Sequence, residues 1–292
     1  MWQDLDPYNM HFPKTHTMNP ERLERLKAIL SIPSTYRQEK FVTEYVVEFC
    51  KKHGFEYFVD KLGSVLITKG KLQEGEFYGC FSAHMDTVHH MNPKQIVEKD
   101  NILTAWHDGR QVGIGGDDLA GCAAALTELL ILPVVKVALF VGEEVGCVGS
   151  RNVASDHPDW FNDVGYMIEF DGPEDYMITA VCSGISLFDP EGEFITKSLP
   201  LLQESMGEKM RMFAHPYTDV SVIKKYFSFS CLNISIGYFN WHSSKEFVVI
   251  SEVEKGIILG EKLAQTLGNK RYEYVDKSHI YNASNKYTNL WG

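Results

Sequence analysis

Residues 134–141 form a nearly continuous apolar run that is bounded by Pro133 and Gly142. A run of this length without a polar face is typical of a strand that is buried on both sides. Residues 164–170 repeat the pattern, and helical segments such as residues 118–130 alternate with these strands. The alternation predicts an α/β fold, with helices on both faces of a mixed, largely parallel central sheet.

The element boundaries follow from local signals. Asn19, Pro20 and Glu21 read as cap, first helical residue and acidic first turn, so they predict a helix start. Ser34 or Thr35 is expected to begin the second helix. Short strands are expected around residues 96–97 and 102–103, and between Thr218 and Tyr226 a helix is expected in which Asp219 acts as the cap.

A glycine-rich stretch, GIGGDDLAGCAAAL, occupies residues 113–126. Its glycines allow a tight turn, and Asp117 and Asp118 stand at the start of the small-residue helix that follows, where the helix dipole favours negative charge. An acidic helix start is usually only a cap. We expect Asp118 to be such a cap or a supporting acid, whereas the residues elsewhere in the chain favour a further role for Asp117.

Further polar residues come just after apolar runs. They are His84 after one strand, Glu143 and Glu144 after another, Asp171 after a third, and His242 close behind a fourth. In open α/β sheets the ligand site lies beyond the carboxyl ends of the strands. The sequence therefore predicts that these residues meet at one edge of the sheet.

Together with Asp117, these residues provide two imidazoles and three carboxylates, a ligand set suited to two divalent ions of the zinc type: His84, Asp117, Glu144, Asp171 and His242. Such a pair can lower the pKa of bound water to about 7 and polarise a substrate carbonyl. Glu143 then becomes the expected general base. Asp86 is expected to accept the second imidazole N–H of His84 and to fix its tautomer.

The motifs HMDTV, GGDDLAG, EEVGCVGS, EFD and WHSSKE together resemble those of the co-catalytic zinc exopeptidases, a clan that includes the M20, M28 and M42 metallopeptidases. The likeness extends over about residues 21–267. It implies two Zn²⁺ ions per chain, with Co²⁺ or Mn²⁺ as substitutes. It also implies that Asp117 bridges them, that His84 and Asp171 complete one site, that Glu144 and His242 complete the other, and that Glu143 is the base.

Two departures from the M20 pattern matter. The interval between Asp171 and His242 leaves no room, beside its expected strands and helix, for a lid domain of about 50 residues. The chain thus combines M20-like motifs with the lidless architecture of M28 enzymes. The lid histidine that would stabilise an oxyanion is also missing, and His215 and Tyr217 are the local candidates for that role. We expect residues 19–268 to form the catalytic domain, residues 1–18 an arm and residues 269–292 a tail.

Three other polar residues near the motifs are expected to be structural. His89 and His90 lie in a polar segment beyond the strand that ends on His84, which favours a surface position. Glu246, four residues after His242, is expected to bind local backbone groups rather than metal.

Composition limits the partners. The net charge of −11 argues against nucleic acid, and no segment approaches the ~20 apolar residues that span a membrane. The six cysteines form no CxxC pair, which predicts buried thiols in a reducing compartment. The first residues also lack the basic start and apolar run of a signal peptide, so a cytoplasmic location is expected. No feature predicts an oligomeric state.

The most specific function that fits is a dinuclear zinc hydrolase of amide bonds, an aminopeptidase or dipeptidase acting on short peptides. A deacylase or amidohydrolase acting on small acylated amines is the alternative among enzymes. A non-catalytic metal- or peptide-binding relative is a third possibility, which the presence of Glu143 disfavours. A single-metal acyltransferase of the glutaminyl-cyclase kind is the fourth, and the five-residue ligand set disfavours it.

Overall fold

The computed structural model of the chain describes residues 17–215 and 217–276, which form two β-sheets and seven α-helices. The larger sheet has the order β1-β2-β7-β3-β8-β12-β9-β10, and β11 pairs with β9. Its strands are β1 (Glu56–Val59), β2 (Val65–Lys69), β3 (Tyr78–His84), β7 (Val135–Phe140), β8 (Val164–Gly172), β9 (Met177–Cys182), β10 (Ile185–Ser186), β11 (Arg211–His215) and β12 (Ser230–Ser235).

The four central strands of this sheet run parallel, since β3 pairs in parallel with β7 and β8, and β12 pairs in parallel with β8. The neighbours β2 and β9 pair with this group in the antiparallel sense. Every residue of β3, β7, β8 and β12 is buried. The expectation from the unbroken apolar runs, a mixed sheet buried on both faces, is therefore confirmed.

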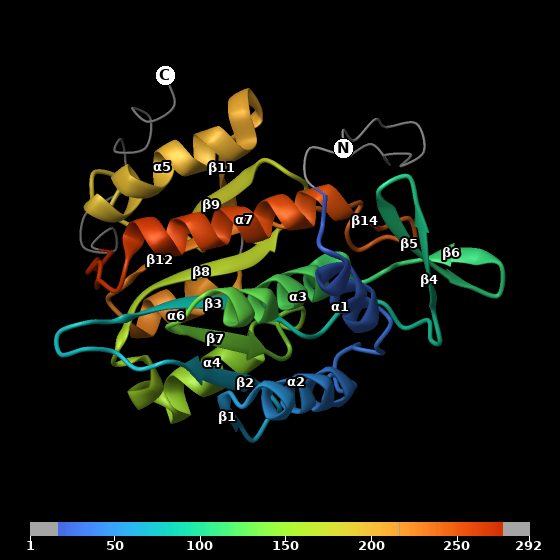
Figure 1. Cartoon of the computed structure of the whole chain (residues 1–292), viewed down its shortest axis with the longest axis horizontal. Coiled ribbons are helices and arrows are strands. Elements are labelled where there is room, and N and C mark those ends of the chain that lie inside the picture. The colour runs from blue at the N-terminus through green and yellow to red at the C-terminus, as the bar shows by residue number, and fades with distance from the viewer. Residues whose placement is uncertain (1–16, 216, 277–292) are drawn as a thin grey trace.

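Helices cover both faces of this sheet (Figure 1). On one face α3 (Gly116–Ile131) packs against β3, β7 and β8, while α1 (Pro20–Leu30) and α7 (Ile250–Leu267) pack against α3. α5 (Glu193–Met206) lies against α7, and α2 (Lys40–His53) packs on β1 and β2. On the other face α4 (Val148–Asp156) packs against α6 (Asp219–Tyr226), which contacts β8 and β12.

The second sheet is small and projects at the right of Figure 1. Its order is β13-β14-β5-β4, with β6 paired to β5. The strands are β4 (Gln95–Lys99), β5 (Ile102–His107), β6 (Arg110–Val112), β13 (Tyr238–Phe239) and β14 (Phe247–Val249). β4 and β5 confirm the expected strands near residues 96–97 and 102–103. Pairing of β14 with β5 ties the segment around His242 to the chain before the glycine-rich turn.

The first two expected helix starts have different outcomes. Asn19 caps α1 as expected, because its side chain accepts a 2.8 Å hydrogen bond from the Glu21 N–H. The expectation that Ser34 or Thr35 starts α2 is wrong, since that helix begins at Lys40. Thr35 instead forms an isolated bridge with Thr87, so its backbone is extended rather than ready to enter a helix.

The expected arm (residues 1–18) and tail (residues 269–292) lie largely outside the described residues. The described start of the tail packs on the body, because Arg271 donates to the carbonyl of Val164 and the buried Tyr272 donates to that of Leu267.

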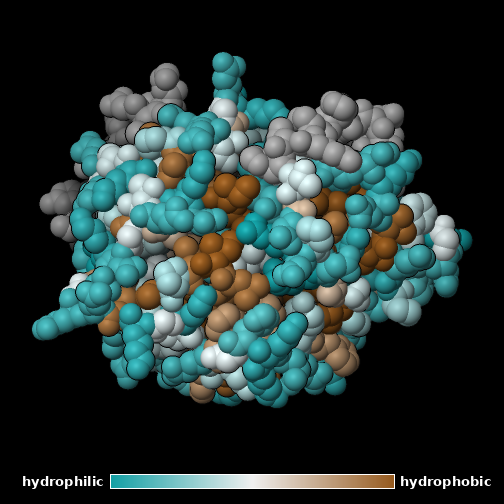
Figure 2. Space-filling view, in the orientation of Figure 1, coloured by the Kyte–Doolittle hydropathy of each residue, from teal (hydrophilic) through white to brown (hydrophobic). Residues whose placement is uncertain are grey.

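All six cysteines are buried and unpaired, as expected. Within the described residues no helix has the length and apolarity to cross a membrane. Figure 2 shows hydrophilic residues around a band of apolar ones on this face.

Candidate metal centre

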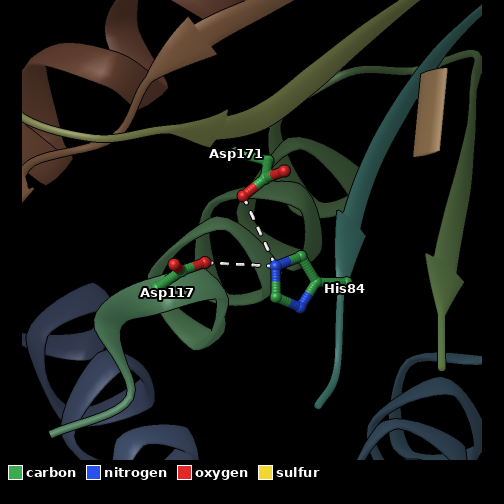
Figure 3. Close-up of side chains that lie close together, drawn as sticks. All are labelled: His84, Asp117 and Asp171. Atoms are coloured by element: carbon green, nitrogen blue, oxygen red, sulfur yellow. Dashed lines mark hydrogen bonds and ion pairs between the residues drawn. The ribbon is translucent and has the colours of Figure 1, made fainter. Parts of the chain in front are cut away.

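The first group of candidate ligands lies where β3, β8 and α3 meet (Figure 3). His84 ends β3, Asp171 lies near the end of β8, and Asp117 stands in the first turn of α3. The His84 Nε2 atom is 3.1 Å from Asp117 Oδ1 and 3.4 Å from Asp171 Oδ1. All three side chains are buried. Parallel pairing of β3 with β8 brings two of them together, as the strand ends predict.

The second group shares Asp117. The other carboxylate oxygen, Oδ2, is 3.2 Å from His242 Nε2, and the same nitrogen is 2.9 Å from Glu144 Oε1. Asp117 therefore turns one oxygen toward each group. The His242 side chain is 47% exposed, so this group opens to solvent whereas the first does not. The structure thus brings together all five residues that the sequence singles out.

The charges of the site suit bound cations. Burial acts to raise the pKa of Asp117, but hydrogen bonds from His242 and His84 outweigh it and leave the pKa below its ordinary value. Hydrogen bonds to Asp117 and Glu144 raise the pKa of His242 to about 10. The carboxylates therefore demand positive charge between them. Two imidazoles and three carboxylates are donors that bind ions of the zinc type.

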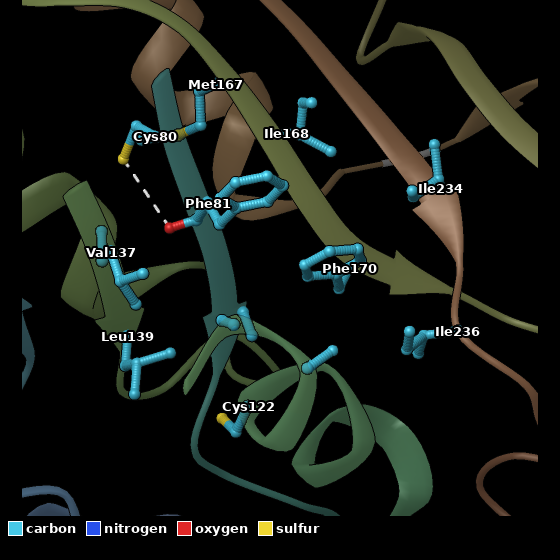
Figure 4. Close-up of a cluster of buried hydrophobic side chains, with 14 of the residues drawn as sticks. Cys80, Phe81, Cys122, Val137, Leu139, Met167, Ile168, Phe170, Ile234 and Ile236 are labelled. Atoms are coloured by element: carbon cyan, nitrogen blue, oxygen red, sulfur yellow. Dashed lines mark hydrogen bonds between the residues drawn. The ribbon is translucent and has the colours of Figure 1, made fainter. Parts of the chain in front are cut away.

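Buried apolar side chains of β3, β7, β8 and α3 pack together next to the strand ends that carry the candidate ligands (Figure 4). Phe81 of β3 and Phe170 of β8 stack with their ring centroids 5.3 Å apart, and both are fully buried. α3 approaches closely, because a Cβ on Gly121 would lie 2.1 Å from the carbonyl oxygen of Phe170. Burial of each phenylalanine contributes roughly 1.5–3 kcal/mol. The strand ends that carry His84 and Asp171 are thus fixed by the core.

Glu143 and Glu144 follow β7 and are held by Asp86. Its two carboxylate oxygens accept the main-chain N–H groups of Glu143 (2.9 Å) and Glu144 (3.1 Å). Because these amides occupy the carboxylate, His84 Nδ1 makes its hydrogen bond to the main-chain oxygen of Asp86 at 3.0 Å, and the carboxylate is 3.5 Å away. The expected contact between these two residues is present, through a different oxygen. Glu143 is buried, which raises its pKa to about 10.

Sequence reasoning missed the residues behind Asp171. Thr218 Oγ1 lies 2.9 Å from Asp171 Oδ2 and also contacts Glu169. The Tyr238 hydroxyl donates to Asp171 Oδ1 at 3.3 Å. Burial raises the pKa of Glu169 well above its ordinary value, and the nearby Asp171 adds to the effect. In an all-buried parallel strand no alternation marks such an acid, so the pattern gave no signal for it.

Of two acids near the centre, Asp118 has the supporting role that the sequence predicts, and Asp219 does not have its predicted role. Asp118 accepts hydrogen bonds from the main-chain N–H groups of His84 and Gly121, both at 3.1 Å, which agrees with a supporting role. Asp219 is not the cap of α6, because Thr218 holds that position in a capping box with Ser221. Asp219 instead lies fully buried, and it accepts a hydrogen bond from Ser150 at 2.5 Å.

Glu246 binds backbone groups as expected, accepting from the N–H groups of Gly115 (2.7 Å) and Asp117 (3.0 Å). The expected surface position of His89 is wrong. Its side chain is only 14% exposed, and its Nε2 atom lies 2.7 Å from Glu246. The buried carboxylate draws the imidazole inward. His90 is exposed, as expected.

The oxyanion candidates lie at the end of β11 and in the following loop. His215 Nδ1 makes a 2.8 Å hydrogen bond with the main-chain oxygen of Tyr217, and the His215 side chain is half-buried whereas that of Tyr217 is exposed. Burial, together with the charges of Glu143 and Glu144, raises the pKa of Tyr217. The charges of the candidate metal centre therefore act on the Tyr217 hydroxyl. The role of Tyr217 as an oxyanion stabiliser stays a prediction.

Several known proteins are similar to this chain in sequence or in fold. Cytosol non-specific dipeptidase of Escherichia coli (strain K12) is 29% identical over 168 residues, which are 53% of this chain and 34% of that protein. The chain thus matches only about a third of the length of this curated relative.

Two solved structures resemble the whole fold. Aminopeptidase PepT from Bacillus cereus ATCC 10987 superposes with a TM-score of 0.71 at 15% identity, covering 85% of this chain and 99% of that one. A tripeptidase from Staphylococcus aureus gives a TM-score of 0.66 at 15% identity, covering 85% and 98%. At such identities the likeness concerns the fold alone. The family model of peptidase family M28 matches residues 65–234, which are more than half of the chain. This protein therefore belongs to peptidase family M28.

Proposed function

We propose that this chain is a dinuclear metallohydrolase that cleaves amide bonds in short peptides, as an aminopeptidase or dipeptidase. The observation that carries the proposal is the position of Asp117, which turns one carboxylate oxygen toward each of two ligand groups. Membership of a peptidase family supports the reaction type. The names of the similar proteins, which include a dipeptidase, an aminopeptidase and a tripeptidase, support the substrate class.

In this proposal His84 and Asp171 hold one ion, Glu144 and His242 hold the other, and Asp117 bridges them. Zinc is the proposed metal because the donor set mixes imidazole nitrogens with carboxylate oxygens. When bound, the two ions would lower the pKa of a water molecule and polarise the scissile carbonyl.

Glu143 is the proposed general base. Its neighbour Glu144 lies in a ligand group whereas Glu143 lies in neither. Burial and the neighbouring acids raise the pKa of Glu143 when no metal is bound, and bound cations would lower it. The Glu143 carboxylate could then take a proton from the attacking water and return it to the leaving amine. Asp86 fixes the loop that carries it through the two main-chain N–H groups. Tyr217 or His215 would stabilise the oxyanion from the exposed side of the site.

We also propose that residues 19–268 are the catalytic unit and that it carries no inserted lid. The described part of the interval between Asp171 and His242 supports this, because β9, β11 and β12 there belong to the main sheet. A cytoplasmic location is proposed from the six unpaired cysteines, which suit a reducing compartment.

Metal analysis tests this function first. The purified protein, dialysed against a trace of zinc, should retain about two ions per chain, as a co-catalytic pair requires. Short peptides should then be cleaved in preference to N-acyl amines. About one ion per chain would contradict the dinuclear proposal, and preferential cleavage of acyl amines would replace peptidase activity by deacylase activity.

The variant Glu143→Ala separates catalysis from metal binding. It should retain both ions and its fold while peptide turnover falls at least ~100-fold, a typical contribution of a general base. Asp117→Ala is the matched comparison, and it should lose both metal and turnover. Turnover of Glu143→Ala close to that of the unmodified protein would exclude the assigned mechanism.

A further inference from the structure

A pocket of about 400 Å³ opens directly beside His242. One wall is the loop after β3, with Val88, His89, His90 and Met91, and the other includes His242, Ser243 and Ser244. Pockets of a few hundred Å³ hold small organic ligands. Since His242 Nε2 lies 2.9 Å from Glu144 and 3.2 Å from Asp117, a molecule that fills this pocket also reaches the proposed metal centre.

The chemistry of this pocket differs from that of the rest of the chain. The chain carries a net charge of −11, yet the residues described as lining the pocket include three histidines and two serines and no acid. His90 and Ser244 are exposed, and within the described residues neither side chain has a protein hydrogen-bond partner. An imidazole N–H and a hydroxyl can both donate to a carboxylate.

Glu246 lies behind the wall formed by the loop after β3, and its carboxylate oxygens already have partners. It is fully buried. One oxygen accepts the Gly115 N–H at 2.7 Å and lies 2.7 Å from His89, while the other accepts the Asp117 N–H at 3.0 Å. Glu246 therefore fixes the wall without offering a free negative charge to the pocket.

The ring of His89 lies flat against the glycine-rich turn, since a Cβ on Gly113 would meet its atoms at about 2 Å. Both Gly113 and Val112 line the pocket. Because Gly113 has no side chain, the His89 imidazole can pack against it and line the pocket. Val88, Val112 and Met91 add apolar surface that suits the carbon atoms of an amino-acid residue.

We propose that this pocket binds a carboxylate of the substrate through His90 and Ser244. The inference rests on the proposed function and narrows its substrate class to short peptides that carry a carboxylate close to the scissile bond. The carboxylate has two sources, the C-terminus of the peptide or an acidic side chain. The pocket chemistry is the same for both.

Matched substrates test the proposal on the metal-loaded full chain. One arm compares dipeptides that have a free C-terminus with the same dipeptides as C-terminal amides. The second arm compares dipeptide amides that carry Glu with those that carry Gln. In at least one arm kcat/KM should favour the carboxylate about tenfold, mainly through KM, because a charge-assisted hydrogen bond is lost with the amide. The arm that shows the preference identifies the source.

The double variant His90→Ala, Ser244→Ala should abolish this preference, since both donors are removed. Both positions are exposed, so the fold should be unchanged. Met91→Ala is the matched control, because it enlarges the same pocket without removing a donor, and it should keep the ratio of carboxylate to amide. Equal rates for carboxylate and amide in both arms, or a ratio that survives in the double variant, would overturn the inference.

Calorimetry keeps this test independent of turnover. Binding of the same ligands to metal-loaded Glu143→Ala should be about tenfold tighter for the carboxylate member, and the double variant in this background should lose the difference. If no peptide is cleaved yet this difference is found, the proposed function fails and the pocket inference stands. If peptides are cleaved and the difference is absent, the inference alone fails.

Discussion

At the scale of single residues, the least compensated group outside the centre is Glu128. This α3 residue is fully buried, and within the described residues neither of its carboxylate oxygens has a hydrogen-bond partner. Burial raises its pKa well above the ordinary value, and the nearby Glu261 and Glu254 add to this effect while Arg22 opposes it. Glu128 is therefore held in its neutral form when the protein is folded.

Replacing Glu128 by Gln should stabilise the protein relative to the unmodified form, and this difference should grow as the pH rises. The folded-state pKa of Glu128 is raised, so its stabilising contribution is complete below the unfolded pKa of about 4.3 and is lost as the pH rises toward the folded pKa. The glutamine amide cannot ionise, so its contribution to stability does not fall over this pH range. Between pH 5 and pH 8 the free energy of unfolding of Glu128→Gln should gain at least ~1 kcal/mol relative to the unmodified protein.

Urea unfolding at both pH values measures this gain. Glu44→Gln is the control, because Glu44 is an exposed helical residue, and its difference from the unmodified protein should be independent of pH. A Glu128 variant whose difference is equally flat would show that the carboxyl group is not neutral in the folded protein.

Thr218 offers a second prediction at this scale. Its hydroxyl contacts both Asp171 and Glu169, so Thr218→Val removes a polar partner of a proposed metal ligand at nearly constant volume. Metal affinity should fall about 10- to 100-fold, as for other residues that orient ligands. Competition with a chelator measures the affinity. Thr196→Val, on an exposed turn of α5, should bind metal as tightly as the unmodified protein.

The sequence predicted the five candidate ligands and the supporting acids Asp86 and Asp118, but it did not predict Glu169 behind Asp171 or the buried Glu128. Each candidate follows an apolar run or a glycine turn, and the end of a strand is visible in the sequence. Glu169 lies inside a strand buried on both faces, and Glu128 lies inside a helix that is buried almost throughout. In both cases the periodicity that separates inner from outer positions is missing.

At the scale of elements, the close approach of α3 to the end of β8 depends on Gly121. A Cβ there would lie 2.1 Å from the Phe170 carbonyl oxygen and 2.3 Å from the Asp118 carboxylate. Gly121→Ala should therefore cost about 1–3 kcal/mol of stability and weaken metal binding, because both displaced groups adjoin the ligand sites. Leu130→Ala, at the other end of the helix, should lower stability while metal affinity is unchanged. Equal metal affinity in both variants would contradict this role of Gly121.

The start of a helix could be predicted where neighbouring residues fix it locally, as the Asn19 cap and the Pro20 that follows it do for α1. The start of α2 could not be predicted in this way, because Thr35 pairs with Thr87 from a distant loop. β6, β13 and β14 have two or three residues each, too few to show a period. The second sheet was therefore recognised only in β4 and β5.

At the scale of the whole molecule, the centre joins segments from distant parts of the chain, so bound metal should stabilise the fold. Addition of zinc to chelator-treated protein should raise the melting temperature at pH 7. The gain should be smaller at pH 5.5, because protons compete with metal for His84 and His242. Thermal unfolding with and without zinc at both pH values measures it. Gly121→Ala should show a reduced gain, and a gain that increases toward acid would contradict this assignment of ligands.

The order of the ligands along the chain also has a consequence for synthesis on the ribosome. His84, Asp117 and Asp171 form the buried group, and they are all made before His242, which completes the exposed group through a segment that β14 ties to β5. A nascent chain that has reached only α6 lacks this last imidazole and the strand that positions it. On the proposed assignment, two metal ions would bind together only after this segment has been made and folded, and a shorter nascent chain would lack the second ligand group.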